Sequence, residues 1–226
     1  MTIQNKHTKR FPTFVIIVGI LAACVGLSTL AFGVLTNKIT LSQPTAAGVA
    51  SENPDVAQEA SDETAIEPKT VSKYSVGADE PRILTIDALK ISARVKPMGV
   101  NSIGAIQAPV NIYDSGWYTG SAKPGAYGAV FIDGHASGAT RKGLFAYLDT
   151  LKNGNMVRIE RGDGQVLQYK VVHVETVSKD AVEMNDVLHT YGNASEGLNM
   201  MTCTGKWIES EKTYDKRVIV YTERVA

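Results

Sequence analysis

Met156-Val-Arg-Ile-Glu-Arg161 and Val166-Leu-Gln-Tyr-Lys-Val-Val-His-Val-Glu-Thr-Val177 are two runs rich in β-branched residues, and they flank Gly162-Asp163-Gly164. Extended runs joined by a short glycine-containing connection are typical of a β-hairpin. The stretch from residue 156 to residue 177 therefore predicts two long antiparallel strands.

Similar short runs recur on both sides of this hairpin, while helical periodicity is scarce. The other expected strands are Arg82–Asp87, Ile91–Lys96, Gly128–Asp133, Leu198–Cys203 and Arg217–Glu223. Short helical patterns are confined to Gly143–Asp149 and Glu183–Tyr191. Many short strands separated by turn signals predict an all-β domain that forms a closed or nearly closed barrel.

The N-terminal part of the chain has the pattern of a membrane anchor. Residues 14–35 carry no charge and consist mainly of Val, Ile, Leu, Ala and Gly. In a helix these residues span about 33 Å, enough to cross a bilayer. Basic residues precede the stretch and the first acidic residue is Glu52, so we expect residues 1–13 in the cytoplasm and the domain outside the cell.

A cleaved signal peptide is the alternative interpretation of this segment. Leu21-Ala-Ala-Cys24 resembles a lipoprotein box, in which Cys24 would be lipidated. The apolar run continues to Leu35, however, whereas a mature lipoprotein usually becomes polar after the cysteine. The pattern favours an uncleaved single-pass anchor, and both interpretations leave the domain tethered outside the cell.

Residues 36–80 are rich in Ala, Ser, Thr, Pro and Glu and contain no aromatic residue before Tyr74. Such a segment buries too little apolar surface to offset the entropy lost on ordering. We therefore expect a flexible extracytoplasmic stalk. A lid that folds over an active site is the functional alternative, which the composition disfavours. The domain itself is expected over residues 81–226.

Charge and cysteine content exclude several classes of function. The 23 basic and 23 acidic residues balance, so no overall positive field indicates nucleic-acid binding. Only two cysteines are present, and Cys24 lies in the apolar stretch. The domain therefore has neither a disulfide framework nor a cysteine metal cluster, and Cys203 is either a buried apolar residue or a reactive thiol.

Cys203 and Arg217 are expected to lie together. Cys203 ends one predicted strand and Arg217 opens the next, with a loop at residues 204–216. If the strands are antiparallel neighbours, the two residues face each other. A guanidinium beside a thiol lowers the thiol pKa and also donates hydrogen bonds to an oxyanion, although an ordinary solvated arginine fits the pattern as well.

His135 is the candidate base of the domain. It follows an apolar strand in Asp133-Gly-His135, where catalytic histidines often occur, although a structural role is common there too. His173 lies within a strand and His189 follows a short helical pattern. Their spacing does not match a metal site, and no metal or cofactor is predicted. Asp180, Glu183 and Asp186 could supply the oxygen ligands of a calcium site, but a solvated loop face is the simpler explanation.

Taken together, these residues resemble the sortase family over about residues 81–226. The T-L-x-T-C motif that carries the family's nucleophile corresponds to Asn199-Met-Met-Thr-Cys203, with Asn and Met in place of Thr and Leu. Gly134-His135 matches the family's histidine and Arg217 its arginine. Gly116-Trp-Tyr118 adds similarity, and class E or F sortases of Gram-positive bacteria are the nearest subgroup.

The resemblance implies an eight-stranded sortase barrel and a cysteine transpeptidase. Cys203 would attack the Thr carbonyl of a C-terminal Leu-Pro-x-Thr-Gly-like sorting signal on a secreted protein and form a thioester. His135 would transfer protons, Arg217 would hold the substrate and the oxyanion, and Thr202 and Met201 would contact the substrate. The resolving amine would come from a peptidoglycan precursor or a pilin lysine.

Other classes fit less well. L,D-transpeptidases carry a Ser-His-Gly-Cys run that this chain lacks, and papain-like enzymes place Cys before His, the reverse of the order here. A non-catalytic surface-binding module on a stalk has no use for a reactive thiol. An inactive sortase-like protein is the remaining alternative, motivated by Asn199.

Overall fold

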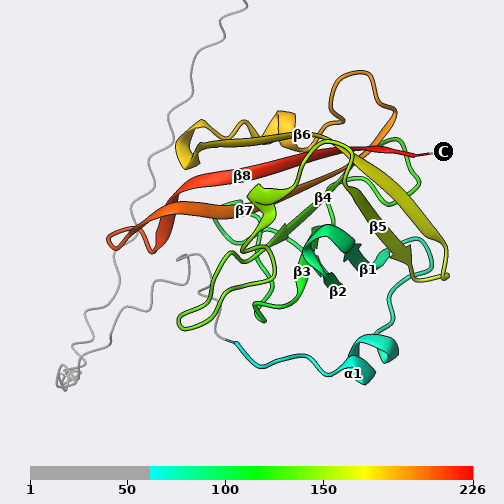
Figure 1. Ribbon diagram of the computed structural model, residues 1–226, viewed down its shortest axis with the longest axis horizontal. Helices are drawn as coiled ribbons and strands as arrows, with labels where there is room; N and C mark the ends of the chain where they lie inside the picture. The colour runs from blue at the N-terminus through cyan, green and yellow to red at the C-terminus, as the bar shows by residue number, and fades with distance from the viewer. Residues whose placement is uncertain (1–61, 226) are drawn as a thin grey trace, which may run out of the picture. The chain divides into compact units, whose positions relative to one another are not determined.

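The computed structural model describes residues 62–225, which form a closed β-barrel of eight strands (Figure 1). The strands are β1 (Pro81–Ile86), β2 (Ile91–Met98), β3 (Ser115–Tyr118), β4 (Gly128–Gly134), β5 (Met156–Arg161), β6 (Val166–Ser178), β7 (Glu196–Ile208) and β8 (Thr213–Arg224). Around the barrel they follow the order β1-β2-β3-β4-β7-β8-β6-β5. The predicted all-β class and the closed eight-stranded barrel are confirmed.

Helices contribute little to the described structure. They are α1 (Pro68–Lys73), α2 (Met184–Val187) and the 3-10 turns η1 (Asp87–Leu89), η2 (Leu148–Thr150) and η3 (Lys179–Ala181). None of the helices in residues 62–225 is long and apolar enough to span a bilayer. The expected anchor at residues 14–35 lies outside the described residues.

The hairpin predicted from residues 156–177 is present. β5 and β6 pair in antiparallel register, with Val157 opposite Tyr169 and Ile159 opposite Leu167. Gly164 adopts φ +84° in the connection, a backbone conformation that favours glycine. Local turn chemistry and strand patterning therefore suffice to specify this part of the barrel.

The connection between β7 and β8 differs from the expected loop at residues 204–216. β7 continues to Ile208 and β8 begins at Thr213, so the two strands form a long hairpin with a register shift between Thr204 and Trp207. The polar composition of this stretch predicts a loop, but the two strands continue to pair with each other through it. Cys203 therefore lies within a strand, not at its end.

Side chains alternate between two apolar clusters across the long strands. Met200 and Val220 point into the barrel, in a cluster that includes Val130, Ile132 and Leu198. Their neighbours Met201, Ile219 and Tyr221 pack on the outer face, with Phe131 and Val187. Figure 1 shows β6, β8 and β7 side by side on this part of the barrel. The outer face of β4, β7 and β8 carries the candidate site.

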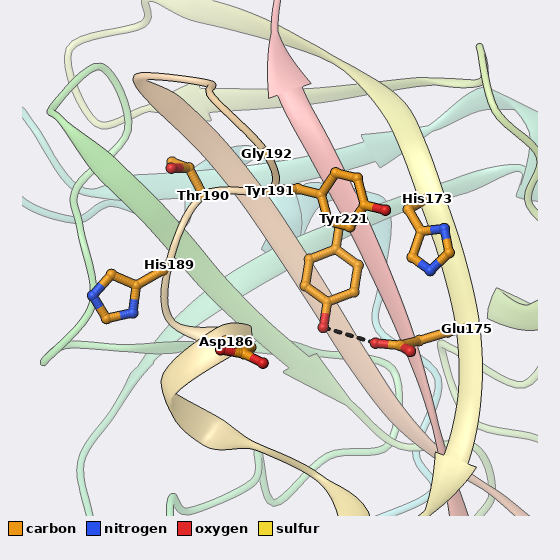
Figure 2. A pocket seen from close by; sticks show the side chains of 8 residues that line it. All are labelled: His173, Glu175, Asp186, His189, Thr190, Tyr191, Gly192 and Tyr221. Atoms are coloured by element: carbon orange, nitrogen blue, oxygen red, sulfur yellow. Dashed lines mark hydrogen bonds between the residues drawn. The ribbon is translucent and has the colours of Figure 1, made fainter.

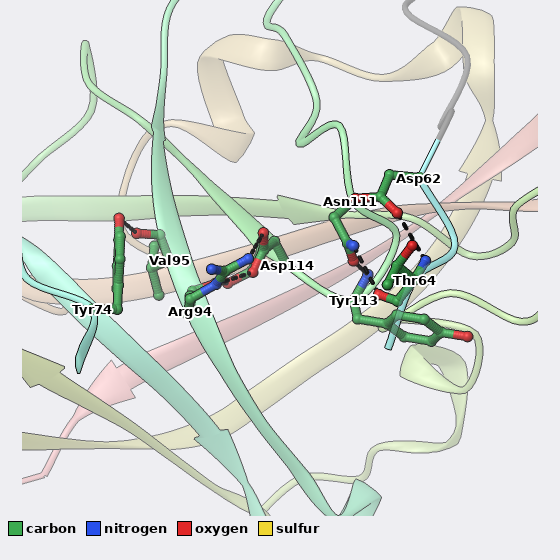
Figure 3. A network of polar contacts seen from close by, with 9 residues as sticks. Asp62, Thr64, Tyr74, Arg94, Val95, Asn111, Tyr113 and Asp114 are labelled. Atoms are coloured by element: carbon green, nitrogen blue, oxygen red, sulfur yellow. Dashed lines mark hydrogen bonds and ion pairs between the residues drawn. The ribbon is translucent and has the colours of Figure 1, made fainter. Parts of the chain in front are cut away.

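Residues 62–80 also contact the barrel. The backbone of Asp62 pairs with Asn111, and the Ile112 N–H donates to the Asp62 carbonyl at 3.0 Å. The Asn111 side-chain amide donates to the Thr64 carbonyl at 2.9 Å (Figure 3). These contacts attach the segment to the loop before β3.

The rest of this segment is held in the same way. After α1, the Tyr74 hydroxyl donates to the Val95 carbonyl at 2.8 Å, and Arg82 donates to the Tyr74 carbonyl at 2.9 Å (Figure 3 draws the first). The expectation of a flexible stalk over all of residues 36–80 is therefore wrong for residues 62–80. That expectation rests on the low apolar content of the segment, and apolar content does not reveal attachment by hydrogen bonds. Residues 36–61 lie outside the described residues.

Candidate active site

Cys203 and Arg217 are direct cross-strand partners on β7 and β8. Strand alternation places both on the outer face, together with Met201 and Ile219. The sequence-based expectation that the two residues face each other is confirmed, although they meet within a hairpin and not across a long loop.

The turn of this hairpin fixes the Arg217 guanidinium. Nη1 donates to the carbonyls of Tyr214 at 2.8 Å and Lys216 at 2.9 Å, and Nη2 donates to the Thr213 hydroxyl at 3.1 Å. None of these partners is a carboxylate, so the cation keeps its charge uncompensated by them. The guanidinium is therefore available as a local positive field beside the thiol.

Two opposing influences set the acidity of the Cys203 thiol. Burial raises its pKa, because a thiolate is poorly stabilised away from water. The charge of Arg217 and hydrogen bonding with Thr213 lower the pKa, whereas the nearby Asp133 raises it when that carboxyl is ionised. Burial is the largest of these effects, so the thiol of the free protein is protonated around neutral pH.

His135 directly follows β4 and is held by a backbone carbonyl. Its Nε2 lies 2.7 Å from the carbonyl oxygen of Pro109. A carbonyl only accepts, so we assign the proton of the neutral ring to Nε2, which leaves Nδ1 basic. Burial lowers the His135 pKa and the Pro109 carbonyl opposes this. The imidazole is therefore neutral in the free protein.

The parallel pairing of β4 and β7 brings His135 alongside Cys203. Asp133 pairs with Met201, and continuing this register by two residues places His135 opposite Cys203. Within residues 62–225 no hydrogen bond joins the imidazole to the thiol. Cys203 and Arg217 thus lie on neighbouring strands, and His135 follows the end of the adjacent strand β4 at the same level of the barrel.

Thr202 and Met201, the two expected substrate contacts, lie on opposite faces. Thr202 is buried and its hydroxyl donates to the Gly134 carbonyl at 2.8 Å, next to His135. This contact ties β7 to the end of β4. Met201 packs in the outer cluster and is partly exposed, on the same face as Cys203.

The sequence matches the family model described as "Sortase domain" over residues 84–225. The chain belongs to the sortase family. Sortase C from Streptococcus pneumoniae shares this fold with a TM-score of 0.51 and 21% identity, over 73% of this chain and 75% of that one. A lid mutant of sortase A from Corynebacterium diphtheriae matches with a TM-score of 0.49 and 21% identity, over 65% and 70%. No curated protein sequence matches.

Asn199, the departure from the sortase motif, has a structural explanation. Its side chain is fully buried, and Nδ2 donates to the carbonyls of Val187 and His189, each at 2.8 Å. These carbonyls belong to the β6–β7 connection, which crosses the outer face after α2. An asparagine amide with two donors holds this loop to β7, whereas a threonine hydroxyl supplies a single donor.

Replacing Asn199 with alanine is expected to lower the free energy of unfolding of this sortase by about 1–3 kcal/mol, because the buried carbonyl of Val187 and the partly buried carbonyl of His189 lose their donor. Chemical denaturation measures the change. Asn193, an exposed residue of the same loop, is the matched control, and Asn193→Ala should leave stability unaltered. Equal stability of N199A and the wild type would contradict the tether.

The loop after His135 is held from two sides. The Glu63 carboxylate accepts hydrogen bonds from the backbone N–H (2.8 Å) and the hydroxyl of Thr140. On the other side the hydroxyls of Ser137 and Tyr214 lie 2.7 Å apart, which connects the loop to the β7–β8 hairpin. The segment before the barrel and the hairpin that carries Arg217 thus both support the position of His135.

Asp133 is the ionisable group that the sequence does not reveal. It lies on the outer face of β4, two residues before His135. Its Oδ1 atom is buried and has no hydrogen-bond partner in residues 62–225. Burial raises the Asp133 pKa to about 8, so the carboxyl is neutral at physiological pH. Nothing in a strand-end aspartate distinguishes it, in sequence, from a solvated one.

This shift gives a pH-dependent stability. Between pH 3.8 and about 8 the unfolded chain ionises Asp133 freely while the folded chain keeps it protonated, so the wild type loses stability as pH rises. The Asp133→Asn variant lacks this loss. We expect its stability advantage to grow by at most about 1.4 kcal/mol per pH unit over that range. Denaturation at several pH values measures it, and a constant difference would contradict the shift.

A cavity of about 330 Å³ opens on the same face, farther along β8 (Figure 2). The rings of His173, Tyr191 and Tyr221 gather there, with His173 stacked on Tyr191 at 5.0 Å between centroids. The Tyr221 hydroxyl donates to Glu175 at 2.9 Å. The cavity is lined by His173, Glu175, Asp186, His189, Thr190, Tyr191, Gly192 and Tyr221.

The remaining histidines and acidic residues do not join the candidate site. His173 and His189 line the cavity in Figure 2, and Cys203 is not among the residues that line it. Asp180, weighed in sequence as part of a calcium site, pairs with Lys179. Nowhere in residues 62–225 do three or more His, Cys, Asp or Glu residues come together in a way that would hold a metal ion.

Proposed function

We propose that this sortase is a membrane-anchored cysteine transpeptidase that cleaves a C-terminal Leu-Pro-x-Thr-Gly-like sorting signal between Thr and Gly. Cys203 carries the acyl group as a thioester, and an amine of the cell wall or of a pilin receives it. The observation that carries the proposal is the cross-strand pair of Cys203 and Arg217, with His135 directly after the neighbouring strand β4.

Acylation begins from a neutral thiol and a neutral imidazole, because burial disfavours the charged form of each. The Cys203 proton passes to the basic Nδ1 of His135, and the thiolate attacks the Thr carbonyl carbon. The new C–S bond forms and the C–N bond to Gly breaks. The imidazolium then gives its proton to the departing amine, so protons balance within the pair.

Arg217 has two roles in this step. Its charge favours the thiolate, and its guanidinium donates hydrogen bonds to the oxyanion of the tetrahedral intermediate. The carbonyls and hydroxyl that hold it in the hairpin preset its orientation. Preorganisation of this kind lets the cation act without reorienting as charge develops.

Transfer reverses the same chemistry. An incoming primary amine attacks the thioester carbonyl while His135 takes a proton from its nitrogen. The C–S bond breaks, a new amide bond forms, and Cys203 regains its proton from His135. Peptidoglycan precursors and pilin lysines supply amines of this class, and water is the competing acceptor.

A membrane anchor at residues 14–35 supports this function. Substrate, acceptor and enzyme at one membrane face meet at a raised effective concentration without any new contact between them. Removing residues 1–35 is therefore expected to slow anchoring in cells, and to leave cleavage of a soluble peptide unaltered.

The test uses the full-length chain, a panel of peptides with sorting signals of different sequence, and an oligoglycine or lysine-containing acceptor. We expect a product in which the N-terminal part of one peptide is joined to the acceptor amine, as identified by its mass. If no peptide is processed while Cys203 still reacts with a thiol reagent, the site is accessible and the proposal fails. A surface-binding role would then be the better explanation.

A further inference from the structure

Asp133 occupies a position between the candidate catalytic residues and the neighbouring strand β3. It pairs with Gly116 on β3 and with Met201 on β7, and the carboxyl lies on the outer face that carries Cys203. Cys203 lies close enough that a negative charge on Asp133 would raise the thiol pKa. The mechanism above does not use this group.

The space for this carboxyl exists because residue 116 is glycine. A Cβ at Gly116 would lie 2.3 Å from Asp133 Oδ1, 2.7 Å from Met98 and 3.1 Å from Pro109. Pro109 also provides the carbonyl that holds His135. The carboxyl group thus fills a gap between β3, the loop before it and the histidine.

This arrangement leaves a buried polar atom unsatisfied. Oδ1 has no donor within residues 62–225, although buried polar groups in native proteins almost always have partners. The Asp133 residue as a whole keeps part of its surface exposed. Oδ1 itself is enclosed on the side of Gly116, Met98 and Pro109, so a ligand meets the carboxyl group through the exposed part of the residue, on the face that carries Cys203.

We propose that Asp133 is a specificity-determining residue that hydrogen-bonds a hydroxyl or amide side chain of the sorting signal, at the peptide position that lies over this end of β4. This inference rests on the proposed function and adds a preference to it. An apolar side chain at that position would leave the buried carboxyl without a partner, and the cost of that appears as discrimination against the peptide.

The chemistry of the group fits such a ligand. A neutral carboxyl has one O–H donor and an accepting oxygen, which matches the donor and acceptor of a serine, threonine, asparagine or glutamine side chain. The Asp133→Asn substitution would keep a donor and an acceptor in a side chain of nearly the same shape, whereas Asp133→Ala would remove both. The two variants therefore separate hydrogen bonding from charge.

The experiment measures kcat/KM for peptides in which each position of the recognised signal is varied in turn among Ser, Asn, Leu and Val. For the wild type we expect one position at which the polar residues are favoured by about tenfold, the effect of one buried hydrogen bond. Asp133→Ala should abolish that preference, and Asp133→Asn should retain most of it. Asp149→Asn, at an exposed carboxylate outside the site, is the control.

Thermal unfolding distinguishes a binding role of Asp133 from a structural one, because a structural role predicts a lower unfolding midpoint for Asp133→Ala. Removal of an unsatisfied buried carboxyl should leave the unfolding midpoint of Asp133→Ala equal to or above that of the wild type. A lower midpoint with an equal loss for all peptides would assign Asp133 to the fold and overturn the inference. So would an unaltered preference in Asp133→Ala.

The outcomes also separate this inference from the proposed function. If peptides are processed in a Cys203-dependent way but no preference depends on Asp133, the inference fails alone. If the wild type processes none of them, both fail.

Discussion

Replacing Cys203 with alanine is expected to reduce peptide cleavage and amide transfer to background, a loss on the order of 10⁴-fold or more. The thioester cannot form without the sulfur, and no other side chain on the outer face at this level of β4, β7 and β8 is a comparable nucleophile. Product formation measured by mass, with the full-length chain, checks the expectation.

The chain offers a matched control for this variant. Cys24 is its only other cysteine. Cys24→Ala should retain transpeptidation in solution, and Cys203→Ala should keep the unfolding midpoint of the wild type to within a few degrees. If activity survived in Cys203→Ala and disappeared in Cys24→Ala, the nucleophile would be Cys24 and the mechanism would be refuted.

Replacing Arg217 with alanine is expected to slow acylation by about 10²–10³-fold, the effect of removing one oxyanion donor. The pH dependence should change as well. Arg217 lowers the Cys203 pKa against the effect of burial, so its removal raises that pKa. Because acylation begins from the protonated thiol, the fall in rate at alkaline pH, where Cys203 ionises without passing its proton to His135, should move to higher pH. Single-turnover rates over a range of pH measure both effects.

Two companion variants sharpen this result. Lys216→Ala removes the exposed cation next to Arg217 and should leave the profile in place. Arg217→Lys keeps the charge but loses the planar set of donors. Compared with Arg217→Ala, it should return the pH profile close to its wild-type position while the acylation rate stays below that of the wild type. An Arg217→Ala profile that coincides with the wild type would mean that the guanidinium does not act on the thiol.

Much of the barrel is predictable from sequence because its signals are local. The β5–β6 hairpin follows from β-branched runs around Gly162-Asp-Gly164, and β4 follows from an apolar run between glycines. β3 spans only Ser115–Tyr118, too short for an alternation pattern to distinguish it from a loop. The extension of β7 and β8 through polar residues depends on mutual pairing, which no single strand encodes.

Some features of the candidate site are likewise predictable from sequence, and others are not. The pairing of Cys203 with Arg217 follows from strand order, and His135 from its place after a strand. The tether made by Asn199 is invisible in sequence, where the residue is only a departure from a motif. Its partners are backbone carbonyls whose positions depend on the whole β6–β7 connection.

The burial of Asp133 and the attachment of the segment before the barrel are not predictable from sequence for a related reason. The environment of Asp133 depends on Gly116, a residue of another strand. The attachment of residues 62–64 depends on hydrogen bonds with Asn111 and Thr140, which composition does not reveal. Residue types alone thus single out the candidate nucleophile, while the groups around it depend on the packing of strands that are distant in sequence.

The measurement that tests the central claim most directly is the intact mass of the full-length chain mixed with a recognised sorting peptide in the absence of acceptor. We predict a mass increase equal to the peptide's N-terminal fragment ending at Thr, mapped by digestion to Cys203 and released by hydroxylamine. A stable product without any adduct on Cys203, or an adduct mapped to another residue, would contradict the thioester mechanism.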